Sequence, residues 1–172
     1  MVRIICITGM PLAGKTLAAS FAKEKGISVI SMGDKVREIM KGDASKFIFE
    51  IREKYGKDAI ARYIAEEIRK LNKDVIVEGI RNMEEVEYFR KIGEVSLIAI
   101  HASPATRYKR ALNRKREDDP SDYTSFKARD ERELALGLGN VIALADYMVV
   151  NEGNEEELKN SFMSIIDRIL NA

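Results

Sequence analysis

The octapeptide GMPLAGKT occupies residues 9–16, between an apolar run rich in β-branched side chains and a segment rich in helix formers. The apolar run, residues 2–7, is typical of a buried strand, and residues 17–25 favour a helix that Gly26 ends. Two glycines, a lysine and a threonine at this spacing match the Walker A pattern, a loop whose backbone N–H groups surround a phosphate. The alternative is an ordinary glycine turn with an exposed lysine, and the position between strand and helix favours the phosphate loop.

Each position of this loop is expected to contribute to a nucleotide site. Lys15 would reach the β- and γ-phosphates of ATP and act in catalysis, and the Thr16 hydroxyl would bind Mg²⁺. Leu12 stands where many such loops have glycine, and a positive φ there would cost on the order of 1 kcal/mol or more. Either the loop keeps a negative φ at Leu12 or its affinity for a triphosphate is reduced. The expected nucleotide-binding residues of the loop are Gly9, Met10, Pro11, Leu12, Ala13, Gly14, Lys15 and Thr16.

Further apolar runs alternate with segments of helical spacing along the chain. The runs are residues 27–30, 75–77, 95–100 and 147–150. Because crossovers that contain helices join parallel strands, the alternation predicts a doubly wound α/β fold with a five-stranded parallel sheet and helices on both faces. The phosphate loop after the first strand makes this the three-layer P-loop NTPase type. We expect one domain, residues 1–172. The stretches 34–72 and 107–140 are too long for simple crossovers and are candidate moving parts.

The composition excludes several classes of protein. The 172 residues include 29 Lys+Arg against 28 Asp+Glu, a net charge of +1, so no overall field attracts nucleic acid or an anionic membrane. The first apolar run is far shorter than the ~20 residues that span a bilayer, which predicts a cytoplasmic protein with no membrane partner. Cys6 is the one cysteine, and we expect a buried thiol. With His101 as the one histidine, a histidine metal cluster or a Ser-His-Asp triad has too few parts.

Polar side chains follow the predicted strands at their carboxyl ends, where open parallel sheets bind ligands. They include Asp34 and Arg37 after the second strand, Glu78 and Arg81 after the third, and Asn151 after the fifth. We therefore expect these side chains at one edge of the sheet, with Asn151 at the bound nucleotide.

Two carboxylates in this set have alternative roles. Glu78 would orient Mg²⁺ through water opposite Thr16, or else it caps a helix or lies at the surface. Asp34 would accept the proton of a hydroxyl acceptor, which is a catalytic role. If the acceptor is a phosphate, no base is required, and Asp34 would cap the helix that it starts or position a phosphate-binding arginine.

A run of cations follows the fourth predicted strand. It comprises Arg107, Lys109, Arg110, Arg114, Lys115 and Arg116. On a helix, Arg107, Arg110 and Arg114 share one face and would converge on the transferring phosphoryl group. Residues 117–120 would end that helix, and Arg129 lies on the next. We expect catalytic roles for Arg110, Arg114 and Arg129, against the alternative of a solvated helix face.

The motifs together resemble those of the nucleotide kinases, including adenylate kinase and dephospho-coenzyme A kinase, and are most similar to an archaeal adenylate-kinase-related family. The resemblance runs from GMPLAGKT through VISMGDKVR and VIVEGIRNMEEVEYFR to REDDP, RDERE, GLGNVIALADYM and VVNEG. It implies ATP on the phosphate loop and an acceptor under the helices after Asp34. Arg37 and Arg81 would hold the phosphate of that acceptor. It also implies an acceptor-binding helical insertion at about 34–72 and a lid at about 107–133 that excludes water.

The favoured function is that of an ATP-dependent nucleotide kinase, which transfers the γ-phosphoryl group of ATP to a nucleoside monophosphate, with AMP ahead of dephospho-coenzyme A or another hydroxyl. A sensor that binds ATP or AMP without turnover is the main alternative, because Leu12 and Glu78 depart from the kinase pattern, which usually has Asp at the latter. An RNA-binding protein is disfavoured by the near-neutral charge and the lack of an aromatic stacking motif. A GTPase is disfavoured because no Asn-Lys-x-Asp motif is present.

Overall fold

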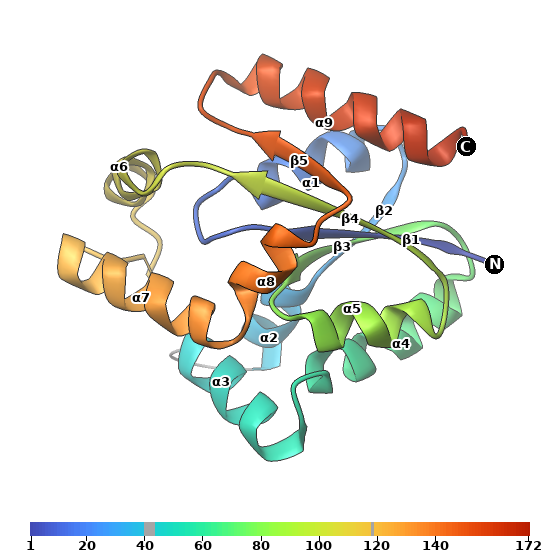
Figure 1. Ribbon diagram of the computed structural model, residues 1–172, viewed down its shortest axis with the longest axis horizontal. Coiled ribbons are helices and arrows are strands. Elements are labelled where there is room, and N and C mark those ends of the chain that lie inside the picture. The colour runs from blue at the N-terminus through green and yellow to red at the C-terminus, as the bar shows by residue number, and fades with distance from the viewer. Residues whose placement is uncertain (40–43, 118) are drawn as a thin grey trace.

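The computed structural model describes residues 1–39, 44–117 and 119–172 and is built around one parallel sheet (Figure 1). The sheet has five strands in the order β2-β3-β1-β4-β5, and every neighbouring pair is parallel. The strands are β1 (Arg3–Thr8), β2 (Ser28–Ser31), β3 (Val75–Ile80), β4 (Glu94–His101) and β5 (Tyr147–Val150). The predicted five-stranded α/β fold is confirmed, although β3 continues through Glu78 to Ile80, beyond the predicted run.

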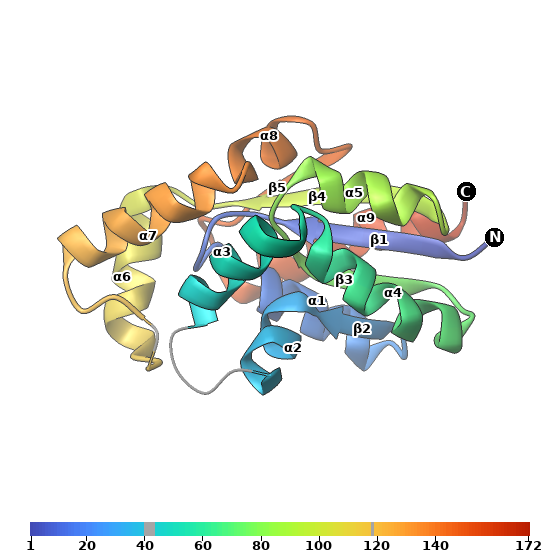
Figure 2. The ribbon, with the colours of Figure 1, turned by 90° about the horizontal axis from the view of Figure 1, so that it is seen from below.

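Helices cover both faces of this sheet (Figure 2). One face packs against α1 (Lys15–Glu24) and α9 (Glu155–Leu170), and the other against α2 (Met32–Ile39), α4 (Ala59–Leu71), α5 (Met83–Arg90) and α8 (Leu138–Ala143). The remaining described helices are α3 (Ala44–Tyr55), α6 (Pro104–Arg114) and α7 (Tyr123–Ala135). The arrowhead of β4 points toward α6, so this helix extends from the carboxyl edge of the sheet (Figure 1).

The core follows from the alternation of side chains along the central strand β1. Ile4 and Cys6 pack against α4 and α5, while Ile5 and Ile7 pack against α1 and α9, and all four are fully buried. Burial raises the pKa of the Cys6 thiol, which fits the expected structural cysteine. Because both faces of β1 are filled by apolar side chains, ligands have access to the edges of the sheet and not to its faces.

Within the described ranges, none of the helices combines the length and the apolar character that crossing a bilayer requires.

Candidate functional site

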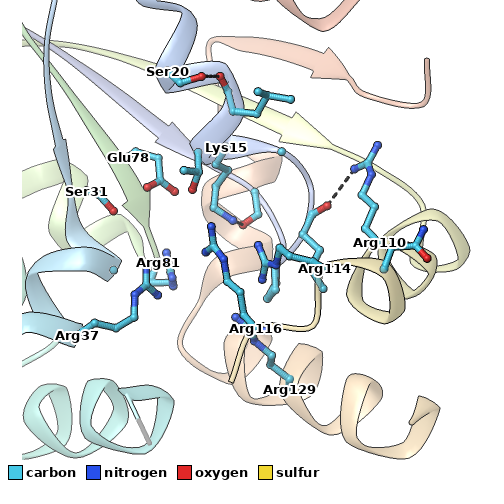
Figure 3. A pocket seen from close by; sticks show the side chains of 18 residues that line it. Lys15, Ser20, Ser31, Arg37, Glu78, Arg81, Arg110, Arg114, Arg116 and Arg129 are labelled. Carbon is cyan, nitrogen blue, oxygen red and sulfur yellow. Dashed lines mark hydrogen bonds between the residues drawn. The ribbon is translucent and has the colours of Figure 1, made fainter. Parts of the chain in front are cut away.

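A hollow of about 650 Å³ opens above the phosphate loop, at the carboxyl ends of β1, β2 and β3 (Figure 3). Positive charge dominates its lining, and Glu78 is the one carboxylate among the described residues that line it. The lining cations are Lys15, Arg37, Arg81, Arg110, Arg114, Arg116 and Arg129. So many cations on one concave surface suit a ligand or ligands with several phosphate groups.

Most of the expected site residues lie on this hollow. Those that line it are Gly9, Pro11, Leu12, Gly14, Lys15, Thr16, Arg37, Glu78, Arg81, Arg110, Arg114 and Arg129. Four others lie beside it. Met10 and Ala13 contribute backbone carbonyls that accept hydrogen bonds, Asn151 lines an adjoining hollow, and Asp34 is exposed.

The phosphate loop turns sharply into α1 at Gly14. Gly14 has a φ of 109°, in the left-handed region, and a Cβ atom there would lie 2.4 Å from Nδ2 of Asn151. That nitrogen instead donates a hydrogen bond of 2.9 Å to the Ala13 carbonyl. Glycine is therefore required at this position both by the backbone angle and by the close approach of the loop after β5.

Leu12 also lies in the left-handed region, with a φ of 68°. Of the two alternatives that the sequence left open, a negative φ at Leu12 is therefore excluded, and a reduced affinity for a triphosphate stays a prediction. The left-handed conformation costs a non-glycine residue roughly 1–2 kcal/mol. Its side chain is buried against Ala111 of α6 and Phe126 of α7, and burial of a leucine stabilises by roughly 1.5–3 kcal/mol, which offsets this strain.

Lys15 is folded back onto the loop. Its Nζ donates hydrogen bonds to the carbonyls of Gly9 at 2.8 Å and of Met10 at 3.0 Å. Burial, together with the positive charge of Arg81, lowers the pKa of Lys15 to about 7, against the partial opposition of Glu78. A phosphate placed in the hollow would supply the negative charge that this buried ammonium group lacks.

A bulge at the end of β3 aims two charged side chains at the hollow. The register between β1 and β3 shifts there, because Ile7 pairs with Glu78 whereas Thr8 pairs with Ile80. Gly79, between them, has a φ of 101°, and the Thr8 hydroxyl donates a 2.8 Å hydrogen bond to the Ile80 carbonyl. Bulges redirect side chains in this way, and both Glu78 and Arg81 face the hollow (Figure 3).

The N-terminus of α2 is capped by Ser31 and not by Asp34. The Asp34 backbone N–H donates to the Ser31 hydroxyl at 3.2 Å, and Asp34 stands inside the first turn of the helix. The capping role expected for Asp34 is therefore wrong. Its carboxylate pairs with Arg37, one turn further along, so the geometry corresponds to the other expected arrangement, in which Asp34 orients this arginine.

The three arginines of α6 diverge instead of converging on one point. Arg107 is buried, pairs with both carboxylate oxygens of Asp130 at 2.9 and 2.8 Å, and lies over the Phe126 ring. Arg110 donates to the carbonyls of Leu12 at 2.9 Å, Ala13 at 3.2 Å and Asn151 at 2.7 Å. The expected convergence is wrong for Arg107, which does not line the hollow. Arg110 does line it, and its hydrogen bonds to the Leu12 and Ala13 carbonyls also hold the phosphate loop in place.

Asp119 forms ion pairs with two of the arginines that line the hollow. Its carboxylate accepts a 2.8 Å hydrogen bond from Nε of Arg114 and lies 3.5 Å from Nη1 of Arg129. Burial opposes its ionisation, but hydrogen bonds from Arg114 and from the Arg116 backbone lower the pKa of Asp119 overall. The carboxylate thus joins α6 to α7 and presents both arginines to the hollow.

A smaller hollow of about 400 Å³ adjoins the first on the side of β5. The two share Gly14, Leu17 and Arg110, and the smaller one is completed by the loop between β5 and α9, where Asn151 and Gly153 line it. The two hollows adjoin at these shared residues. Arg110 is the one arginine among the described residues that line the smaller hollow, so the larger one suits a phosphate chain and the smaller one suits a less charged group.

Comparison with known proteins assigns this architecture to a family. The model of the AAA domain family matches residues 5–136. The UPF0200 protein of Sulfurisphaera tokodaii is 44% identical over 176 residues, which cover 99% of each chain. The UPF0200 protein of Methanococcus maripaludis is 44% identical over 182 residues and 98% of each chain. The chain belongs to the archaeal UPF0200 family.

Solved structures place the UPF0200 chain among the P-loop kinase folds. Shikimate kinase from Aquifex aeolicus superimposes with a TM-score of 0.58 at 19% identity, over 98% of this chain and 99% of that one. Dephospho-CoA kinase from Campylobacter jejuni gives a TM-score of 0.56 at 17% identity, over 98% of each chain. The expected resemblance to kinases with a phosphate loop is confirmed at the level of fold.

Several residues that organise the UPF0200 site had no role assigned from the sequence. They are Asn113, Arg116, Asp119, Asp130 and Glu133. The charge-rich motifs REDDP and RDERE contain the three acidic ones, Asp119, Asp130 and Glu133. Acidic residues after a run of cations indicate ion pairs, so these motifs were a signal for them. Which acidic residue pairs with which arginine depends on how α6 packs against α7, and neither motif predicts that packing.

Proposed function

We propose that this protein is an ATP-dependent phosphotransferase that moves the γ-phosphoryl group of ATP to a nucleoside monophosphate, with AMP the favoured acceptor. The observation that carries the proposal is the charge of the larger hollow, where six arginines and Lys15 face one carboxylate. These cations come from opposite sides, with Arg37 and Arg81 facing the phosphate loop across the hollow (Figure 3). Two phosphate-bearing ligands meeting end to end would match this arrangement.

The nucleotide would lie along both hollows. Its phosphates would lie on residues 9–16, where the N-terminus of α1 and Lys15 favour negative charge, and its nucleoside would occupy the smaller hollow near Leu17, Asn151 and Gly153. Arg110 already hydrogen-bonds both walls of that path, so we assign it a contact with the nucleotide as well as a support role.

Thr16 and Glu78 would hold Mg²⁺. A hydroxyl and a carboxylate are oxygen ligands of the kind that this ion prefers, and both line the hollow beside Lys15. When bound, the ion would neutralise charge on the phosphates. Glu78 is buried at the end of β3, so its position is fixed by the sheet.

The acceptor site favours a phosphate over a hydroxyl. Arg37 and Arg81 supply guanidinium groups that suit phosphate, whereas the carboxylate of Asp34 is paired with Arg37 and is not among the described lining of the hollow. A hydroxyl acceptor would need a base at the reacting atom, and a phosphate acceptor would not. Within the insertion at 34–72, of which residues 40–43 lie outside the described ranges, Arg37 would hold the acceptor.

Catalysis would rest on positioning and on charge neutralisation. Lys15, Arg114 and Arg129 line the hollow where the two ligands would meet, and they would stabilise the transferring phosphoryl group. Helices α6 and α7, within a lid at residues 107–133, would exclude water from it.

The test is transfer of label from γ-³²P-ATP with Mg²⁺ to a panel of nucleoside monophosphates and dephospho-coenzyme A. We expect labelled ADP from AMP, and a rate at least about 100-fold lower for Lys15→Ala, the size of loss typical when one group that stabilises transition-state charge is removed. Lys23→Ala, which removes an exposed lysine from the same helix, is the matched control. Label transfer to dephospho-coenzyme A alone would contradict the assigned acceptor.

A nucleotide sensor is the second candidate, favoured by the left-handed conformation of Leu12, which departs from the glycine common at that position. For a sensor, AMP and ATP would bind and raise the melting temperature while no label moves. That outcome would replace the enzyme proposal, and absence of ATP binding would defeat both.

A further inference from the structure

Resting on the proposed function, we infer that Glu133 is a positioning residue for the acceptor: it aims Arg81 at the acceptor's phosphate. Glu133 lies on α7, within the region assigned to the lid, and Arg81 follows β3. Oε2 of Glu133 lies 3.0 Å from Nε of Arg81, and the side chains are 7% and 15% exposed. An ion pair so well shielded from water restricts where the guanidinium group points.

Glu133 itself does not line the hollow, whereas Arg81 does. The carboxylate therefore lies behind the arginine, on the side away from the ligand. The ion pair engages Nε, which is itself buried, so the terminal nitrogens of Arg81 lie outside it. Arg81 remains able to donate to a phosphate while the negative charge behind it holds its position.

The backbone of Arg81 is fixed separately from its side chain. Its N–H donates a 2.7 Å hydrogen bond to Oε1 of Glu85 on α5, and its Nη1 donates to the Gly79 carbonyl. The first contact places the base of the residue, and the second holds one corner of its guanidinium group against the bulge. Glu133 is the carboxylate from a different layer of the structure that meets the opposite part of this group, at Nε, so the orientation of the group depends on the position of α7 as well as on the bulge.

Helix α7 links Arg81 to the cations around the phosphoryl group. Arg129 lines the hollow one turn before Glu133, so both side chains share a face of the helix. The helix end beyond Glu133 is anchored, because Leu136 packs on the core and a Cβ at Gly137 would lie 3.5 Å from Asn82 Cβ. A shift of α7 would therefore move Arg129 and the partner of Arg81 together, which couples acceptor binding to the lid.

The experiment compares Glu133→Gln with Glu131→Gln, an exposed carboxylate on the same helix and the same change of charge. Calorimetry would measure the Kd of AMP and, separately, of the ATP analogue AMP-PNP with Mg²⁺. We expect Glu133→Gln to weaken AMP binding about tenfold, the effect of misaligning one charge-assisted contact, and to leave the Kd of AMP-PNP within about twofold, with Glu131→Gln matching the wild type for both.

A double-mutant cycle separates positioning from a merely structural role. In an Arg81→Met background, Glu133→Gln should cause no further loss of AMP affinity, because the carboxylate would act through the missing guanidinium group. Equal AMP affinity in the Glu133→Gln and wild-type proteins, or a full additional loss in the Arg81→Met background, would overturn the inference alone. A wild-type protein that binds AMP-PNP but not AMP would overturn the acceptor assignment as well.

Discussion

The two sides of the larger hollow are built from different kinds of interaction. On the nucleotide side, which comprises residues 9–16, α6 and the loop after β5, side chains donate to backbone carbonyls: Arg107 to Pro11 at 3.3 Å, Arg110 to Leu12 at 2.9 Å. On the acceptor side, which comprises α2 and the end of β3, the ion pair of Arg37 with Asp34 joins two side chains that are 42% and 62% exposed.

This difference indicates which side of the hollow holds its shape without a ligand. Hydrogen bonds to backbone carbonyls fix the path of the chain, whereas exposed ion pairs cost side-chain entropy, are screened by salt and stabilise little. The nucleotide side is therefore preorganised. On the acceptor side, Arg37 can adjust to the molecule that enters, whereas Arg81 is held by its shielded ion pair with Glu133. Substitutions on the two sides test this contrast.

Glu85→Ala should cause the largest loss of stability, because Glu85 is where the acceptor side rests on the core. Its carboxylate accepts from buried Arg52 at 2.8 Å and from the Arg81 N–H, and it completes the capping box of α5. Removing one partner of a buried ion pair costs about 3–5 kcal/mol. Urea unfolding would measure it, with Glu84→Ala, an exposed neighbour on the same helix, as control. A loss below about 1 kcal/mol would show that this pair is not the anchor.

Arg110→Met should weaken AMP-PNP binding about 10- to 100-fold, since charge-assisted hydrogen bonds contribute about 1.5–3 kcal/mol and this residue makes several to the phosphate-loop region. AMP binding should be unchanged. Calorimetry on both ligands checks this, with exposed Lys109→Met as the control on the same helix. Equal losses for AMP and AMP-PNP would break the division into two sides.

Lys15 should make nucleotide binding depend on pH. Burial is the main cause that lowers the pKa of Lys15 to about 7 when no phosphate is bound. A bound phosphate would raise this pKa. Nucleotide binding should therefore take up a proton at any pH where Lys15 of the ligand-free protein is neutral. Affinity for AMP-PNP should consequently fall as pH rises above 7, by about fivefold between pH 7 and pH 8. Calorimetry in buffers of different ionisation enthalpy would detect the proton. Lys15→Met should abolish both effects; their persistence would assign them to another group.

Arg37→Met should change the free energy of unfolding least, by less than about 0.5 kcal/mol, because its pair with Asp34 is exposed. Urea denaturation in low and high salt measures this change. A loss above about 1 kcal/mol would mean that α2 is held as firmly as the phosphate loop, and the contrast between the sides would fail.

The sequence was sufficient for the sheet and for much of the lining of the hollow. Apolar runs with β-branched residues located all five strands, and the parallel arrangement then brought Glu78 and Arg81 to the same edge as the phosphate loop. It was not sufficient for Arg107, whose spacing matches that of Arg110 but whose partner Asp130 lies 23 residues away on another helix. Side chains one turn apart share a helix face, yet packing decides which of them is buried.

Leu12 illustrates the same limit within the phosphate loop itself. Two backbone conformations were compatible with its sequence, and the left-handed one was selected by contact with Ala111 and Phe126, about one hundred residues further along the chain. Local propensity disfavours this conformation, and burial of the side chain compensates for it.

What the amino-acid order determined by itself is the alternation of strands and helices and the spacing of the phosphate loop, because periodic apolar patterns and glycine turns act over a few neighbouring residues. The pairing of charges, by contrast, comes from tertiary packing: Asp119 pairs with two arginines, Glu133 lies behind Arg81, and Arg110 donates to the loop carbonyls. Those pairings depend on distances between helices that are set when the core packs, and the same charges would find other partners on a differently packed lid.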